Sequence, residues 1–275
     1  MGMLYRKHQL IRTPWEGVAK SAQHAVNLVP VIRHPGLWEI YREDGRTDRC
    51  LRRLLTPSSN CIDVGAHIGS TLSLLTKLAP KGSHLAVEPV ATKAAWLRAK
   101  FPDVEVHEMA ASNTTGTVAF VENLTRPGFS GLRASSDPSA ALDEVREIEV
   151  ACNRLDDIVE TDRPVHLLKI DVEGAEQLVL EGAAELLERD RPAIVFESGP
   201  GRAEEFGLSN SGLYSLLVDG HGYEVFLFKD HLAGRPPLGL AEFRAAHVYP
   251  FLAFNFLALA VGRACDGEKA RSAGR

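Results

Sequence analysis

The sequence predicts a doubly wound α/β fold, and two features of the chain indicate it. Short apolar runs typical of buried strands alternate with segments of helical spacing, the order that builds a parallel sheet with helices on both faces. The run VHLLKID (165–171) is apolar almost without interruption, as in a central strand buried on both sides.

The first alternation begins at residue 61. CIDV (61–64) is a short buried strand by composition, and GSTLSLLTKLA (69–79) follows with leucines at helical spacing. HLAVE (84–88) and VEVHEMA (104–110) are the next strands, separated by the helical run ATKAAWLRAKF (91–101). These residues therefore predict three strands linked by two helices.

An excursion interrupts this order. GTVAFVE (116–122) and EIEVACNR (147–154) have strand composition, and we expect them to pair in a hairpin-like arrangement. The loop 123–140 between them is dense in Gly, Pro, Ser and Asn, so we expect it to be mobile. With Arg126, Phe129 and Arg133 it could close over a substrate as a lid, or it could be a plain connection.

The alternation then resumes with the strand 165–171. We expect a helix over 173–189, a strand over 192–197, and a helix around 212–220 that ends at a glycine acting as C′ cap. Two late strands, 223–228 and 251–260, are joined without an obvious helix and could form an antiparallel edge.

The two ends of the chain fall outside this order. Residues 1–46 have a helical pattern and predict an N-terminal helical extension that caps the sheet or the site. Residues 47–262 form the α/β domain, and the small polar residues of 263–275 predict a disordered tail. The apolar face of the extension could also support a homo-oligomer.

Composition narrows the function classes. The 275 residues carry a formal net charge of −5, so no basic field exists and we expect no nucleic-acid partner. No secretory h-region is present, and the most apolar segment, 251–262, is too short for a transmembrane helix. Four scattered cysteines fit a reducing compartment. We therefore expect a cytoplasmic protein with no transmembrane segment.

The stretch IDVGAHIGS (62–70) predicts a ligand site at the end of the first strand. Gly65 and Gly69 would let the backbone approach a ligand, and Asp63 suits the ammonium of an amino acid better than a phosphate. Glu88, at the end of the second strand, could bind ribose hydroxyls. S-adenosylmethionine carries both groups. The alternative is a helix cap for Asp63 and a surface carboxylate for Glu88.

Two further features of the strand ends are open to more than one interpretation. His67 could orient ligand or water, but we favour a turn position that asparagine would also suit. Asp171 should emerge at the carboxyl end of its strand and face the crevice. Glu173 and Glu176 should lie in the first turn of the next helix, where stabilisation by the helix dipole could be their whole role.

The motifs IDVGAHIGS, AVEP, NRLDDIV, LLKIDVEGAEQLVLEGA, PAIVFE and NFLA occur in this order, and the chain from 61 to 258 resembles the FkbM-type methyltransferases. The resemblance implies a mostly parallel seven-stranded sheet of the class I, Rossmann-like methyltransferase fold, with the methyltransferase domain at 47–262. It also implies O-methylation by S-adenosylmethionine of a sugar hydroxyl, in a glycolipid or polysaccharide, or of a polyketide-type natural product. One departure is His67, where the family usually has asparagine.

The resemblance also assigns the site residues. The turn residues Asp63, Gly65, Ala66, His67 and Gly69 would line the methionine end of the donor. Glu88, followed by Pro89, would hold the ribose, and Met109 and Ala110 would border the adenine. Asp171 would face donor and acceptor together.

The chemistry needs a hydroxyl to lose its proton as the new bond forms. Asp171, or Glu173 beside it, is the predicted base, with Lys169 or His221 tuning its charge. A divalent metal held by these acids, Mg²⁺ or Mn²⁺, is the alternative. Glu197, at the end of its strand, is a further crevice candidate.

Two other functions compete with methyl transfer. A nicotinamide-dependent oxidoreductase would need the GxGxxG fingerprint, which is incomplete here, and would not favour Asp63. A binding module that kept the fold and lost the activity is disfavoured because Asp63, Glu88 and Asp171 are all present.

Overall fold

The structure is a computed structural model that describes residues 11–13, 35–132 and 142–262. Most of the expected N-terminal extension, Arg133 in the loop, and the expected disordered tail lie outside these residues. Helix α4 (Glu43–Leu54) runs through position 46, and the division of the chain at 46/47 stays a prediction.

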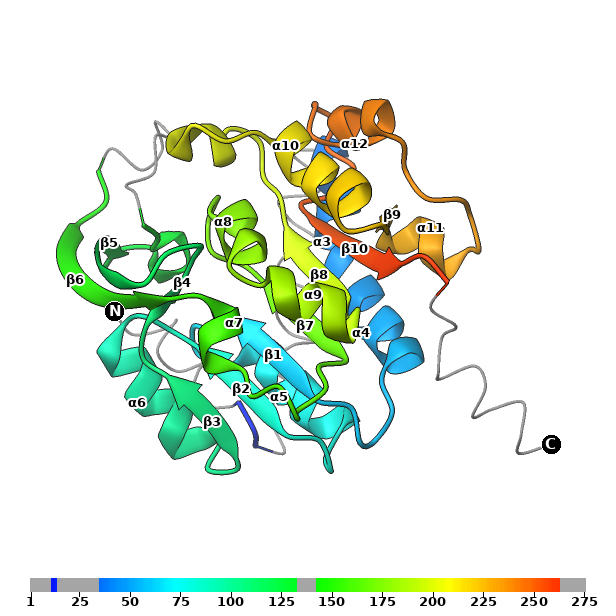
Figure 1. The fold of residues 1–275 in the computed structure, drawn as a ribbon. Coiled ribbons are helices and arrows are strands. Elements are labelled where there is room, and N and C mark those ends of the chain that lie inside the picture. Colours follow the sequence, from blue (N-terminus) through cyan, green and yellow to red (C-terminus); the bar gives the residue numbers. More distant parts are fainter. Residues whose placement is uncertain (1–10, 14–34, 133–141, 263–275) are drawn as a thin grey trace.

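A seven-stranded sheet of order β3-β2-β1-β7-β8-β10-β9 forms the centre of the molecule (Figure 1). Five neighbouring strands are parallel, and β10 is antiparallel to both β8 and β9, which confirms the predicted antiparallel edge. The strands of this sheet are β1 (Cys61–Val64), β2 (His84–Val87), β3 (Val104–His107), β7 (Leu167–Ile170), β8 (Ala193–Glu197), β9 (Tyr223–Leu227) and β10 (Asn255–Ala260). The chain thus has the α/β sheet that the strand and helix pattern predicts, in the seven-stranded class I, Rossmann-like arrangement that the resemblance implies.

Helices cover both faces of the sheet because successive strand residues point to opposite sides. Cys61 and Leu167 pack with residues of α4, α5 and α11, whereas Ile62 and Leu168 pack with residues of α7, α8, α9, α10 and α12. The remaining helices are α3 (Trp38–Tyr41), α5 (Ser70–Leu78), α6 (Ala91–Lys100), α7 (Leu155–Ile158), α8 (Glu176–Glu181), α9 (Ala184–Asp190), α10 (Asn210–Ser215), α11 (Phe228–Leu232) and α12 (Leu240–Ala246).

A second, three-stranded sheet of order β4-β6-β5 lies to one side of the main sheet (Figure 1). It contains β4 (Ala110–Ala111), β5 (Gly116–Asn123) and β6 (Val145–Asn153), and β5 pairs with β6 antiparallel over its whole length. The predicted hairpin-like excursion is therefore confirmed. A short 3₁₀ turn, Pro127–Phe129, follows β5.

Three local predictions are wrong. The helix expected over 173–189 starts only at Glu176 and is broken between α8 and α9, where a Cβ on Gly182 would lie 1.9 Å from the Ser112 carbonyl oxygen. The helix expected around 212–220 is confirmed and ends at Gly220 in a π-helical turn, but Gly220 is not a C′ cap, because the glycine with positive φ is Gly222. Two helices, α11 and α12, join the late strands.

In the part of the chain that the structure describes, none of the helices has the length and apolar character needed to cross a membrane. Cys50, Cys61 and Cys152 are buried free thiols.

Candidate active site

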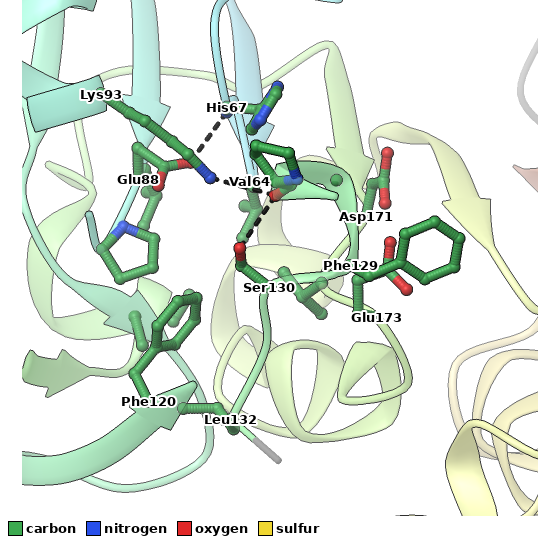
Figure 2. Close-up of a pocket in the computed structure, with 18 of the residues that line it drawn as sticks. Val64, His67, Glu88, Lys93, Phe120, Phe129, Ser130, Leu132, Asp171 and Glu173 are labelled. Atoms are coloured by element: carbon green, nitrogen blue, oxygen red, sulfur yellow. Dashed lines mark hydrogen bonds between the residues drawn. The ribbon is translucent and has the colours of Figure 1, made fainter. Parts of the chain in front are cut away.

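A cavity of about 320 Å³ opens at the carboxyl ends of β1, β2, β7 and β8, as expected for an open α/β sheet. Its roof comes from the segment after β5 (Figure 2). The cavity is lined by Val64, Gly65, His67, Val87, Glu88, Pro89, Lys93, Met109, Ala110, Ala111, Phe120, Pro127, Gly128, Phe129, Ser130, Leu132, Asp171, Val172, Glu173 and Glu197.

The turn after β1 forms one wall, and its backbone conformation explains its sequence. Gly65 has φ +74°, and a Cβ there would lie 1.8 Å from the backbone oxygen of Asp171. His67 has φ +53°, a left-handed conformation that asparagine adopts readily, which supports the turn interpretation of this residue. At Gly69 a Cβ would strike the Phe101 ring at 2.5 Å, so this glycine serves packing against α6 rather than ligand approach.

Glu88 follows the last residue of β2, and its buried carboxylate is held in place by backbone hydrogen bonds. Its Oε2 accepts a hydrogen bond from the His67 backbone N–H at 2.8 Å, and Oε1 accepts one from the Val90 N–H at 3.0 Å. Burial raises the pKa of Glu88 above its ordinary value, although the Lys93 charge and these two hydrogen bonds act to lower it. Figure 2 shows the Lys93 ammonium beside this carboxylate. A carboxylate held rigidly at a cavity wall can accept hydrogen bonds from a diol.

Asp63 is placed differently from its prediction. It is fully buried and does not line the cavity, because its strand position puts it on the α5 face of the sheet, opposite Lys169 in the register. Lys169 Nζ lies 3.3 Å from Asp63 Oδ1 and 3.2 Å from Asp171 Oδ2. Neither of its buried carboxylate oxygens makes a hydrogen bond to the described residues, so the Lys169 ammonium is the group that compensates its charge. Lys169 Nζ also donates to the Gly65 carbonyl oxygen at 3.4 Å, so the Asp63 carboxylate is linked to the turn through Lys169.

Three carboxyl groups meet at the other end of the cavity. Asp171, Glu173 and Glu197 each bring an oxygen within 4.8 Å of the others. Burial, then the Asp171 charge, raises the pKa of Glu173 to about 8. Burial, then the charge and hydrogen bond of Asp171, raises the pKa of Glu197 well above its ordinary value. Burial also acts to raise the pKa of Asp171, but the Lys169 ammonium and the Glu197 hydrogen bond outweigh it and lower that pKa.

Glu173 sits in a strained turn, not in the first turn of a helix as predicted. Its φ is +59°, which is uncommon for a residue with a side chain, and Arg202 contacts its carboxylate at 3.2 Å. Glu176 holds this turn because its Oε1 accepts hydrogen bonds from the N–H groups of Val172 and Gly174, both at 3.1 Å. The role of Glu176 is thus more specific than stabilisation by the helix dipole.

Eight of the eleven predicted site residues line the cavity: Gly65, His67, Glu88, Pro89, Met109, Ala110, Asp171 and Glu173. Asp63, Ala66 and Gly69 do not line it and support the turn. His221 directly precedes the short turn into β9, and β9 begins at the amino end of the neighbouring parallel strands, away from the cavity. The His221 carbonyl oxygen accepts a hydrogen bond from Arg191. Sequence reasoning missed Lys93 and Phe120 in the lining.

The donor set at the acidic end could also hold a hard divalent cation. Carboxylate oxygens are the ligands that Mg²⁺ and Mn²⁺ prefer, and three carboxyl groups are gathered here.

Residues 63–227, more than half of the chain, match the family model described as the methyltransferase FkbM domain. Among curated proteins, none matches this chain.

Solved structures of methyltransferases are similar to this chain at low sequence identity. The FkbM methyltransferase of Methylobacillus flagellatus is 16% identical with a TM-score of 0.47, and the match covers 74% of this chain but 44% of that one, so this chain spans less than half of its length. A putative methyltransferase from Thermobifida fusca is 13% identical with a TM-score of 0.43, and 87% and 88% of the two chains are covered. An rRNA methylase from Streptococcus thermophilus is 12% identical with a TM-score of 0.41, and 80% and 96% are covered.

Proposed function

The chain belongs to the FkbM methyltransferase family, and we propose that it is an S-adenosylmethionine-dependent O-methyltransferase. The acceptor in this proposal is a small molecule or glycan that offers a hydroxyl of a sugar, in a glycolipid or polysaccharide, or of a polyketide-type natural product. The enzyme is proposed to act in the cytoplasm, which the buried free thiols support.

The observation that carries the proposal is the Glu88 carboxylate. It is buried, held by two backbone N–H donors, and faces a cavity, an arrangement suited to the two hydroxyls of a ribose. Met109 and Ala110 would border the adenine from the same side, since all three residues follow β2 and β3. The methionine end would lie along Gly65 and His67.

Asp63 has an indirect part in this proposal. Because it is buried under the turn and paired with Lys169, it would hold the wall of the donor site rather than bind the donor ammonium itself. The bound donor would supply an electrophilic methyl group on a sulfonium, so the chain's own residues need only place the acceptor and remove its proton.

Glu173 is the base that the electrostatics favour. A base with a pKa near the working pH removes protons more effectively than one with a low pKa. The pKa of Glu173 is raised to about 8, whereas that of Asp171 is lowered by Lys169 and Glu197. In this scheme Glu173 takes the acceptor proton, and Asp171 accepts a hydrogen bond that orients the hydroxyl.

Two measurements test this scheme. With a turned-over acceptor, kcat/KM should rise as the pH passes through about 8, because Glu173 then loses its own proton, and Glu173→Gln should abolish the rise and cost about 10²–10⁴ in rate. A rate that chelator removes and Mg²⁺ or Mn²⁺ restores would instead assign the acids to a metal.

Calorimetry with S-adenosylhomocysteine tests the proposal as a whole. We expect one molecule to bind per chain and Glu88→Gln to weaken binding about tenfold or more, because an amide cannot accept from both ribose hydroxyls as a carboxylate does. Surface variant Glu224→Gln is the matched control, since Glu224 is exposed on β9. Binding of NAD in place of S-adenosylhomocysteine would favour the oxidoreductase, and binding without any methyl transfer would favour the inactive module.

A further inference from the structure

The roof of the cavity presents an aromatic ring to the acidic end of the site. Phe129 lines the cavity, and the residue is 38% exposed. All five residues line the one cavity, and in Figure 2 the ring lies on the side of the view that holds Asp171 and Glu173, whereas Lys93 and Glu88 lie on the other side. The ring thus lies in the half that the donor residues do not occupy.

A network of polar contacts holds this exposed ring in place. The Arg126 guanidinium lies 4.6 Å from the centre of the Phe129 ring, and Arg126 Nε donates to Asp143 at 2.8 Å. Asp143, itself nearly buried, also accepts from Asn123 Nδ2 at 2.6 Å. The backbone is fixed as well, because Phe129 N–H donates to the Arg126 carbonyl at 2.9 Å.

The turn that carries the ring is tied to the rest of the site. Lys93 Nζ donates to the Pro127 carbonyl at 3.2 Å, and Ser130 Oγ donates to the same carbonyl at 2.9 Å. Gly131 pairs with Val121 of β5 through two backbone hydrogen bonds. A ring backed by a cation and held by a hydrogen-bonded turn is pre-organised, so binding against it costs little side-chain entropy.

We propose that Phe129 is the specificity-determining platform for the acceptor, on which a hydroxylated ring stacks with its hydroxyl directed at Asp171 and Glu173. The inference rests on the proposed methyl transfer. A pyranose with an apolar C–H face and an aromatic ring share the required chemistry, which is a flat apolar face next to a hydroxyl. An open-chain polyol offers the hydroxyls without such a face.

Saturation-transfer NMR on the protein loaded with S-adenosylhomocysteine tests this platform. The probes, at millimolar concentration, are methyl α-D-glucopyranoside, catechol and the open-chain polyol mannitol. In the wild-type protein the ring protons of at least one cyclic probe should receive saturation about threefold or more above mannitol. The cyclic probe that responds distinguishes a sugar acceptor from an aromatic one.

Three substitutions of Phe129 separate stacking from simple space filling. Phe129→Tyr keeps a flat ring and should keep the signal, whereas Phe129→Ala and Phe129→Leu should each lose it by about threefold or more. If the residue only closed the cavity by bulk, leucine would preserve the signal. Leu142→Ala is the matched control, since Leu142 adjoins Asp143, is 96% exposed and does not line the cavity.

The failure of this inference can be told from failure of the proposed function. All four variants should bind S-adenosylhomocysteine within about threefold of the wild type, which also shows that they are folded, because the ring lies outside the donor half. Absence of S-adenosylhomocysteine binding by the wild type would overturn the proposed function. Three outcomes, each with normal binding of S-adenosylhomocysteine, would overturn the platform alone. The first is equal saturation of mannitol and the ring probes, and the second is no saturation of either ring probe. The third is a signal that persists in Phe129→Ala or Phe129→Leu.

Discussion

Replacing Lys169 with methionine should destabilise the protein strongly, because this one ammonium compensates two carboxylates. Its Nζ lies 3.3 Å from Asp63, which is fully buried, and 3.2 Å from Asp171, whose side chain is 38% exposed. Removing one partner of a buried pair costs about 3–5 kcal/mol, whereas the partly exposed contact contributes about 0–1 kcal/mol. The Asp63 contact therefore dominates, and we expect a loss of about 3–5 kcal/mol at pH 7.

Urea unfolding of the wild type and Lys169→Met measures this loss. The midpoint should fall while the slope with denaturant stays constant, and the melting temperature should drop by roughly 6–20 °C, given about 2–4 °C per kcal/mol for a chain of this size. The double variant Asp63→Asn with Lys169→Met removes both charges and should recover at least half of the loss. A loss below about 1 kcal/mol in Lys169→Met would refute the reasoning.

The same variant makes a prediction about pH. Without the ammonium, the folded-state pKa of Asp63 rises further above its unfolded value, so the folded state holds a proton that the unfolded state has released. Stability then falls as the pH rises between these two values. The free energy of unfolding that Lys169→Met loses relative to the wild type should accordingly be smaller near pH 5 than at pH 7. An equal deficit at both values would place the cost in lost packing instead of uncompensated charge.

Substitutions at three further positions test the turns around the cavity. Gly65→Ala should cost about 2–5 kcal/mol in urea unfolding and abolish binding of S-adenosylhomocysteine, because φ is +74° and the new Cβ would lie 1.8 Å from the Asp171 oxygen; unchanged binding would contradict this. His67→Asn should change stability by no more than about 0.5 kcal/mol, since asparagine suits the left-handed turn, and a loss above about 1 kcal/mol would count against the turn interpretation. Glu176→Ala should cost about 1–3 kcal/mol, whereas Glu176→Gln keeps an oxygen that accepts from both N–H donors. Burial raises the pKa of Glu176 to about 7, so the wild type should lose stability as the pH rises from about 4.5 to 7, and Glu176→Gln should lose less. The same dependence of stability on pH in both proteins would contradict this pKa.

The central sheet was readable from the sequence because strand burial leaves a direct signal. The runs at 61–64, 84–88, 165–171 and 192–197 are apolar and continuous, and the structure turns each into a parallel strand. The excursion at 116–154 was readable for a similar reason, since alternation and β-branched residues indicate a half-buried strand.

The bounds of the helices were harder to predict from the sequence, because tertiary contacts determine where some of them begin and end. The break between α8 and α9 comes from the close approach of Gly182 to the Ser112 backbone, which no periodicity reveals. Helices α11 and α12 are short, with five and seven residues, and so contain too few turns for an apolar stripe to stand out.

Site residues could be predicted from the sequence where they follow the end of a strand. They could not be predicted where the face of the sheet to which the side chain points decides their place. Glu88 and Asp171 follow strand ends and line the cavity, as the fold requires. Asp63 lies within β1, so the pleat turns its side chain to the α5 face and to Lys169. For Phe129 the sequence predicts a loop that could close over a substrate as a lid or be a plain connection. It does not predict how the ring is held, because Arg126 and Asp143 come from both flanks of that loop.

A crystal structure of the protein grown with S-adenosylhomocysteine tests the central claim most directly. The account predicts ligand density in the cavity at the carboxyl ends of β1 and β2, with both ribose hydroxyls within hydrogen-bonding distance of Glu88 and the sulfur directed towards Asp171 and Glu173. Density at another place, or an empty cavity at millimolar ligand, would contradict it.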